Sequence, residues 1–221
     1  MSLTLLFHPL SSFCHKVLIA LYENDTPFTP QIVNLQDEGE RAALCKLWPM
    51  GKFPVLVDAA RDWNVSESSI IIEYLDLHFP GKTKFIPADA DLARQMRFRE
   101  RVFDLYVHLP MQKIVGDRLR PADRKDPHGV EEARATMRTA LGMIDQAMAT
   151  KTLASKTWAT GDTFTMADCA AAPSLFYADK VMPFGETHPH AAAYLARLMQ
   201  RPSYARVLKE AEPYFKFFPK G

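Results

Sequence analysis

The stretch that decides the fold is residues 3–22, LTLLFHPLSSFCHKVLIALY. Leu3–Phe7 is a short, largely apolar run of the kind that forms a buried strand, and residues 8–12 interrupt it with a proline and two serines. After this interruption apolar positions recur at helical spacing, and Ser11 or Ser12 can serve as the N-cap. The stretch therefore predicts a strand followed directly by a helix that begins beside the serines.

The next 60 residues extend this pattern into one α/β domain. Residues 27–34 predict a second strand at a sheet edge, because prolines cannot donate to a ladder. Residues 37–47 predict a helix, and residues 53–57 and 63–65 predict a hairpin. Ser68 is expected to cap a strongly periodic helix that ends before a proline. The resulting order, βαβαββα, is that of a thioredoxin-like domain.

The sequence changes character after Pro87, because long helical patterns replace the strand signals. A first long helix is expected to be bent or interrupted at Leu109–Pro110, and a second is expected to be its antiparallel neighbour. The predicted helices cover residues 91–119 and 129–148, with shorter ones from Thr165, His190 and Ser203. We therefore expect a thioredoxin-like domain over residues 1–80, a linker over 81–89 and an all-helical domain over 90–221.

Composition and charge exclude several classes of protein. The 27 Lys and Arg residues nearly balance the 26 Asp and Glu residues, so nucleic-acid binding is unsupported. The N-terminus does not resemble a signal peptide, and no segment approaches the roughly 18 apolar residues of a membrane span. Three widely spaced cysteines without a CxxC pair predict a cytoplasmic protein with no structural metal. His8 and His15 are interpreted as surface or capping residues.

Three segments carry residues suited to binding and catalysis. Ser11 and Ser12 lie at a helix N-terminus, where backbone N–H groups and the helix dipole favour an anion such as a thiolate, although both could simply cap the helix. Pro54 begins a strand, and a cis bond before it would turn the Phe53 main chain outward to pair with an extended peptide. An ordinary trans proline is the alternative. Lys52 could hold a carboxylate or simply be solvated.

The third segment is Glu67–Ser68, at the start of another predicted helix. Ser68 and its neighbouring N–H groups suit a carboxylate, and the Glu67 carboxylate suits an ammonium group. Together the two residues fit a zwitterionic amino-acid head, and a plain N-cap is the alternative. Further along, Thr165 precedes Asp168 by three residues in a variant of the capping box, to which we assign a structural role.

Taken in order, these motifs resemble the glutathione S-transferase family, and the resemblance covers nearly the whole chain. Residues 11–17, SSFCHKV, look like the active-site segment of the serine-type theta and zeta classes. Residues 52–56, KFPVL, look like the family's cis-proline loop, Glu67–Ser68 like its γ-glutamyl-binding pair and residues 165–168, TMAD, like its capping box. Phe13 stands where the zeta pattern has cysteine, so we assign neither that class nor its isomerase reaction.

The resemblance implies a glutathione transferase with glutathione as cosubstrate, no metal and a homodimeric assembly. It places thiol activation on Ser11, with Ser12 beside it, and the cysteinyl main-chain contact on Phe53. It makes Pro54 the cis proline and Lys52 a contact for the glycine carboxylate, with Glu67 and Ser68 as the γ-glutamyl contacts. A small hydrophobic electrophile is expected between the domains, against Leu10, Phe103, Tyr106, Val107, His108 and Met111.

Two other functions stay open at this stage. Cys14 also lies near the helix N-terminus, which can lower a thiol pKa, so it could act as the nucleophile of a glutathione-dependent thiol transferase or reductase. The chain could instead be a non-catalytic interaction protein with the same fold, because fold alone does not determine function. The sequence leaves the electrophile and the class within the family undetermined.

Overall fold

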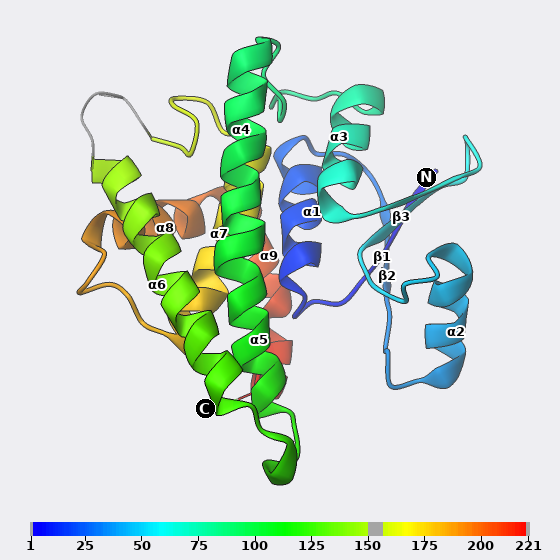
Figure 1. Ribbon diagram of the computed structural model, residues 1–221. Helices are drawn as coiled ribbons and strands as arrows, with labels where there is room; N and C mark the ends of the chain where they lie inside the picture. The colour runs from blue at the N-terminus through cyan, green and yellow to red at the C-terminus, as the bar shows by residue number, and fades with distance from the viewer. Residues whose placement is uncertain (1, 150–156, 220–221) are drawn as a thin grey trace. The chain divides into compact units, whose positions relative to one another are not determined.

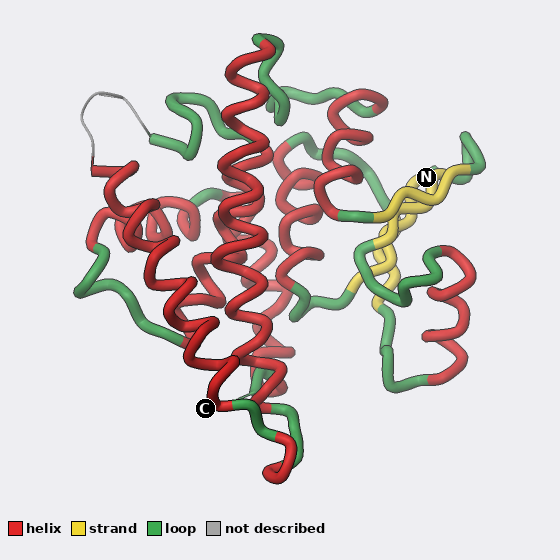
Figure 2. Tube along the Cα trace, viewed as in Figure 1, coloured by secondary structure: helices red, strands yellow, loops and turns green. Residues whose placement is uncertain are grey.

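The protein is described by a computed structural model that covers residues 2–149 and 157–219. One mixed sheet, yellow in Figure 2, lies in the N-terminal part of the chain. Its strand order is β2-β1-β3-β4, with β1 parallel to β2 and antiparallel to β3, and β3 antiparallel to β4. The strands are β1 (Leu3–Phe7), β2 (Thr29–Ile32), β3 (Val55–Asp58) and β4 (Trp63–Ser66). The predicted βαβαββα order is confirmed, with β2 at an edge of the sheet, where the missing N–H of Pro30 is tolerated.

Helices cover both faces of this sheet. They are α1 (Ser12–Glu23), α2 (Glu38–Leu47) and α3 (Ser68–His78). Leu6, Val33 and Val55 form a buried cluster with Leu44 of α2. Side chains alternate along a strand, so the intervening residues of β1 and β3 face the other helix layer, where α1 packs against α3. Figure 1 shows α1 and α3 on one side of the sheet and α2 on the other.

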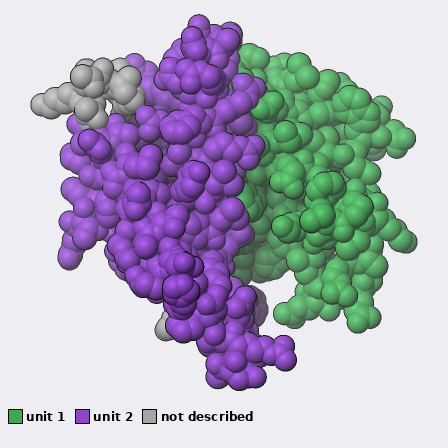
Figure 3. All heavy atoms as spheres, viewed as in Figure 1, with its two compact units in different colours: residues 1–86, 203–216 green, residues 87–202, 217–221 purple. Residues whose placement is uncertain are grey.

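The chain divides into two compact units (Figure 3). Unit 1 comprises Met1–Ile86 and Ser203–Lys216, and unit 2 comprises Pro87–Pro202 and Phe217–Gly221. Residues 203–216, which we expected in the helical domain, therefore group with the sheet. They contain most of α9 (Pro202–Ala211) and of the 3₁₀ segment η4 (Glu212–Phe217).

Hydrogen bonds explain why the C-terminal segment belongs to unit 1. The Ser203 hydroxyl donates to the buried Glu23 carboxylate at 2.5 Å. The Tyr22 hydroxyl donates to Glu210 at 2.6 Å, and Arg206 bonds the other oxygen of Glu210 while its guanidinium lies over the Tyr22 ring. These bonds tie α9 to the C-terminal end of α1, and their partners are too far apart in sequence for a local pattern to reveal them.

Unit 2 is helical throughout its assigned elements, which confirms the predicted all-helical domain. Its helices are α4 (Ala90–Val102), the π-helical η1 (Phe103–His108), α5 (Leu109–Arg118), the 3₁₀ segment η2 (Ala122–Arg124), α6 (Pro127–Ala149), α7 (Met166–Val181) and α8 (Pro189–Gln200). Helix α7 is buried along most of its length and packs against α4, η1, α5 and α8. The predicted capping box at its start is confirmed, with Thr165 and Asp168 bonded to each other's backbone.

The long helix predicted over residues 91–119 is present, but its irregularity lies just before Leu109–Pro110 and not at these two residues. Figure 1 shows α4 and α5 as one continuous column, and the irregularity takes the form of the π-helical segment η1 just before Pro110. Proline lacks an N–H, and its ring crowds the carbonyl four residues earlier, so a wider turn accommodates it. No helix among the described residues is both long enough and apolar enough to cross a bilayer.

Candidate active site

The sheet register brings the three predicted site segments to one end of unit 1. The antiparallel pairing of β1 with β3, continued past the ladder, places His8 opposite Phe53. The pairing of β3 with β4 likewise places Pro54 opposite Glu67. Helices α1 and α3 both begin at this end, so two helix N-termini, each with backbone N–H groups unused by the helix, lie at the same place.

Ser11, one of the two serines that the sequence offered as the N-cap, caps α1. Its hydroxyl oxygen accepts a hydrogen bond from the Cys14 N–H at 3.4 Å, and its own N–H donates to the His8 carbonyl at 2.9 Å. A serine hydroxyl carries one donor and two acceptor sites, so capping leaves the single O–H to donate either to the Cys14 sulfur or to a ligand. Ser11 is partly exposed, whereas Ser12 is the first residue of α1 and is buried. The geometry therefore makes Ser11 the accessible hydroxyl of the pair.

Cys14 lies on the inner side of α1 and is fully buried. Burial raises the pKa of its thiol to about 12, against the lowering effect of hydrogen bonds from Ser11 and His8. Thiolate chemistry needs an exposed sulfur with a lowered pKa. This environment therefore disfavours the alternative in which Cys14 acts as the reactive thiol.

The loop before β3 contains a cis peptide bond between Phe53 and Pro54, so the cis alternative for this loop is confirmed. Among the described residues, the Phe53 N–H and C=O have no backbone hydrogen-bond partner. Pro54 is buried and Phe53 is half-buried, while Lys52 is exposed. The Phe53 main chain is thus available to pair with an extended peptide.

The start of α3 differs from its prediction, because Glu67 and not Ser68 occupies the N-cap position. Ser68 is the first helical residue and is buried, whereas Glu67 is exposed and its side chain makes no capping bond. Glu67 has a φ of 67°, in the left-handed region that residues other than glycine seldom adopt. Backbone of this kind is held by its surroundings and is concentrated at functional sites. Sequence alone carried no signal for it.

A buried lysine joins the starts of the two helices. Lys16 of α1 has only 1% of its surface exposed, and its ammonium donates to the Ser69 hydroxyl of α3 at 3.0 Å. Ser69 directly follows Ser68, so this bond holds the first turn of α3 against α1. The role of Lys16 cannot be read from the sequence, because a single lysine in a helix gives no sign of where its side chain points.

The two histidines at this end are not simple surface residues, which corrects that interpretation. His15 is fully buried, and its Nε2–H donates to the Pro9 carbonyl at 2.6 Å. Burial lowers the pKa of His15 to about 4, against the raising effect of that bond. His8 is half-buried, and its ring stacks on Phe53 with centroids 6.0 Å apart. Both histidines therefore hold the loop that leads to Ser11.

The six residues predicted to contact an electrophile differ in exposure. Phe103, Val107, His108 and Met111 are buried, and Phe103 contacts the ring of Tyr194 within unit 2. Tyr106 is 52% exposed and Leu10 is partly exposed. A side chain must reach the surface to line a binding site, so only these last two offer appreciable area. The assignment of the set stays a prediction.

Three or more His, Cys, Asp or Glu side chains do not come together as a metal-binding group anywhere in the described ranges. This end of unit 1 offers two helix N-termini, the Phe53 main-chain N–H and C=O, a partly exposed serine and an exposed carboxylate. These groups suit a short peptide that carries carboxylates, an ammonium group and an ionisable side chain.

Comparisons with known proteins match the N-terminal and C-terminal parts of the chain to the two domains of one family. Residues 5–83 match the family model for the glutathione S-transferase N-terminal domain, and residues 127–197 match that for the C-terminal domain. Glutathione S-transferase F6 from Arabidopsis thaliana is 28% identical over 213 residues, which cover 91% of this chain and 96% of the relative. A stringent starvation protein A homolog from Histophilus somni is 27% identical over 213 residues, covering 96% and 92%.

The fold is similar to that of solved structures as well. A glutathione S-transferase from Methylobacillus flagellatus, solved with GSH bound, superimposes with a TM-score of 0.84 at 25% identity. The superposition covers 93% of this chain and 98% of that one.

Proposed function

Because this chain belongs to the glutathione S-transferase family, we propose that it binds glutathione at the end of unit 1 described above and activates the thiol through Ser11. The Phe53 main chain would pair with the cysteinyl residue of glutathione, and Lys52 would contact the glycine carboxylate. Ser68 and the first turn of α3 would bind the γ-glutamyl carboxylate, with the Glu67 carboxylate on its ammonium group. The thiolate would then attack a small hydrophobic electrophile.

The observation that carries this proposal is the placement of the Ser11 hydroxyl. Ser11 is partly exposed at the N-terminus of α1, and the sheet register places the loop that ends at Ser11 beside Phe53. A ligand whose cysteinyl backbone pairs with Phe53 would therefore carry its thiol close to that hydroxyl. In this arrangement a hydrogen bond from Ser11 lowers the thiol pKa, so no side-chain base is needed to ionise the thiol.

The energetics are sufficient for thiol activation. A free thiol with a pKa of about 8.5 is only about 3% ionised at pH 7. Lowering that pKa by about two units requires about 2.7 kcal/mol of preferential stabilisation of the thiolate. A hydrogen bond to a charged group contributes about 1.5–3 kcal/mol, and a helix N-terminus about 0.3–1 kcal/mol. The hydrogen bond from Ser11 and the N-terminus of α1 together can supply this stabilisation of the thiolate.

Replacing Ser11 tests the proposal directly. In Ser11→Ala the pKa of bound glutathione should rise by about one to two units, so turnover near pH 7 falls by about tenfold and recovers as the pH increases. Affinity for glutathione should change less, because the peptide contacts remain. Ser11→Thr, which keeps a hydroxyl, should retain most of the wild-type profile. An unchanged pH–rate profile in Ser11→Ala would refute the mechanism.

The similarity to stringent starvation protein A homologs, whose name states no transferase activity, keeps a non-catalytic role as the second candidate. Retention on a glutathione column tests binding alone. A turnover screen against aryl halides, epoxides, organic hydroperoxides, disulfides and maleyl compounds then tests catalysis. A protein that is retained but turns over none of these would favour the second candidate.

A further inference from the structure

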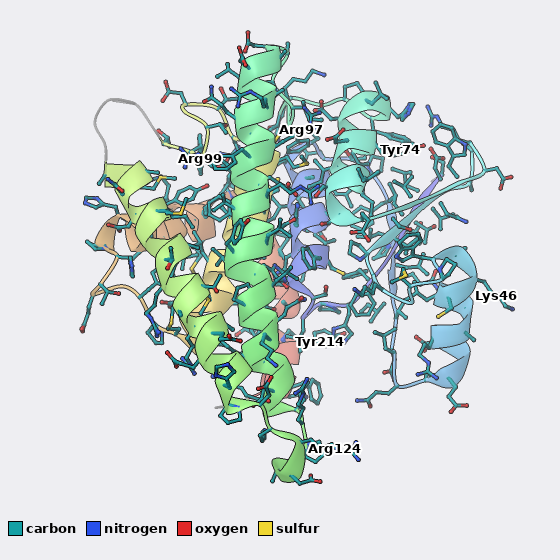
Figure 4. The ribbon with its side chains drawn as sticks, in the orientation of Figure 1. Lys46, Tyr74, Arg97, Arg99, Arg124 and Tyr214 are labelled. Atoms are coloured by element: carbon teal, nitrogen blue, oxygen red, sulfur yellow. The ribbon has the colours of Figure 1, made fainter. Side chains whose placement is uncertain are left out.

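The imidazole of His8 lies between two aromatic rings of unit 1. It stacks on Phe53, with an interplanar angle of 18°, and it meets Tyr214 edge-on, with centroids 5.7 Å apart. Phe53 precedes β3, and Tyr214, labelled in Figure 4, lies in η4 near the C-terminus. One side chain therefore touches the cis-proline loop and the C-terminal segment while belonging to the loop between β1 and α1.

His8 also organises its own loop through two acceptor atoms. Its ring Nδ1 accepts a hydrogen bond from the Leu10 N–H at 3.2 Å, and its carbonyl oxygen accepts from the Ser11 N–H at 2.9 Å. Burial lowers the pKa of His8, which keeps the ring neutral near neutral pH. A neutral ring that accepts at Nδ1 carries its proton on Nε2. The turn that ends at Ser11 is thus held by the His8 ring as well as by its backbone.

We propose that His8 is a positioning residue that sets the Ser11 hydroxyl and the Phe53 main chain at the separation required by the cysteinyl residue of glutathione. The inference rests on the proposed function, in which these two groups bind the thiol and the backbone of the same residue. Hydrogen bonds weaken steeply as their geometry departs from linearity, so both groups must be correctly placed at once. A misplacement of about 1 Å can reduce catalysis about a hundredfold.

The C-terminal segment takes part in this arrangement through Tyr214. That segment is fixed to unit 1 upstream, where Ser203 bonds Glu23 and Tyr22 bonds Glu210. Tyr214 then supports the edge of the His8 ring. Tyr214 is consequently part of the support of the proposed glutathione site, although it lies about 200 residues from Ser11 in the sequence.

Two substitutions separate the roles of the His8 ring. His8→Asn keeps an acceptor for the Leu10 N–H, since asparagine bonds the N–H two residues on in Asx turns, but it removes the stacked ring. The KM for glutathione should rise about 2- to 10-fold while the pKa of the bound thiol is unchanged. His8→Phe keeps the ring contacts and removes the acceptor. The thiol pKa should then rise by about half a unit to one unit, with a smaller change in KM.

Substitutions of Tyr214 test the C-terminal support. Tyr214→Phe should behave as the wild type, and Tyr214→Ala should raise the KM for glutathione in the same direction as His8→Asn. Tyr74→Phe is the matched control, because it removes the hydrogen bond from the Tyr74 hydroxyl to Asp58, at the end of β3 far from Phe53, and touches neither His8 nor the C-terminal segment. It should lower the melting temperature and leave both the thiol pKa and the KM of the folded enzyme unchanged.

The outcome that would overturn the inference is specific. If His8→Asn and His8→Phe lower only the melting temperature, as Tyr74→Phe does, and keep the wild-type KM and thiol pKa, His8 is a packing residue and nothing more. Failure of the proposed function appears differently. In that case the wild-type protein is not retained by glutathione, or Ser11→Ala leaves the pH profile unchanged.

Discussion

Lowering the pH should destabilise the protein through His15, a residue buried behind the candidate site. Its Nε2–H donates to the Pro9 carbonyl at 2.6 Å, and its ring meets Tyr204 of α9 edge-on, with centroids 6.2 Å apart. Burial lowers the pKa of the folded-state imidazole to about 4, compared with 6.5 ordinarily. Protonation would therefore place a charge inside unit 1, next to the loop that carries Ser11.

The sign and the size of the effect follow from these two pKa values. Because the folded-state pKa lies below the unfolded one, the unfolded chain takes up the proton first as the pH falls. The contribution of neutral His15 is complete above about pH 6.5 and is lost progressively down to about pH 4. The gap between the pKa values corresponds to about 3 kcal/mol, a substantial part of the 5–15 kcal/mol typical of folded proteins.

Urea denaturation of the wild type and of His15→Gln at several pH values measures this contribution. Glutamine can donate an N–H to the Pro9 carbonyl but does not titrate, and carboxylates that titrate at low pH affect both proteins alike. At neutral pH the variant should be the less stable, since it loses the contact with Tyr204. The difference should then move by about 3 kcal/mol in favour of the variant between about pH 7 and about pH 4.

The reasoning fails if the difference in unfolding free energy between the two proteins is independent of pH over this range. Such a result would mean that His15 has similar pKa values in the folded and unfolded states. His15 would then not be the buried neutral residue described above.

Three further predictions concern other parts of the chain. Asp168→Ala should lower the unfolding free energy by at least about 3 kcal/mol, because buried Asp168 accepts hydrogen bonds from the Ala159 and Thr165 backbones and from Tyr194. Urea denaturation should measure this loss, and the glutathione affinity of the folded fraction should be unchanged. Cys14→Ala should keep conjugation activity, and intact mass should reveal no mixed disulfide with glutathione in the wild type; a glutathione adduct on the Cys14 sulfur would restore the redox alternative. We also expect a homodimer, so sedimentation that shows only monomer at micromolar concentration would contradict it; Leu77, 73% exposed in α3, suits a disrupting Leu77→Glu variant.

Much of the secondary structure of both units could be predicted from sequence because its signals are local. A strand from Leu3 to Phe7, an N-cap at Ser11 and a capping box at Thr165 each depend on residues within a few positions of one another. The motifs at Ser11, Pro54 and Glu67 could be assigned to one site only through their resemblance to a known family. The sheet register supplies the physical reason, since the pairing of β1, β3 and β4 brings all three to one end.

The environment of each side chain was decided by tertiary packing alone. Cys14, His15 and Lys16 are consecutive in the first turn and a half of α1, and helical periodicity does not predict that all three are buried. Their burial depends on α3 and α9, which pack on α1 from distant parts of the sequence. The left-handed Glu67 likewise has a backbone that its own residue type disfavours.

The sequence by itself therefore determined the order of the elements, their ends and the residue types available for chemistry, because propensity, periodicity and capping act over one or two turns of chain. The tertiary structure alone decided that the Cys14 thiol is inaccessible, which histidines support the Ser11 loop and that residues 203–216 belong to the unit containing the sheet. Burial and the pKa changes that follow from it depend on contacts between segments that the linear sequence does not bring together.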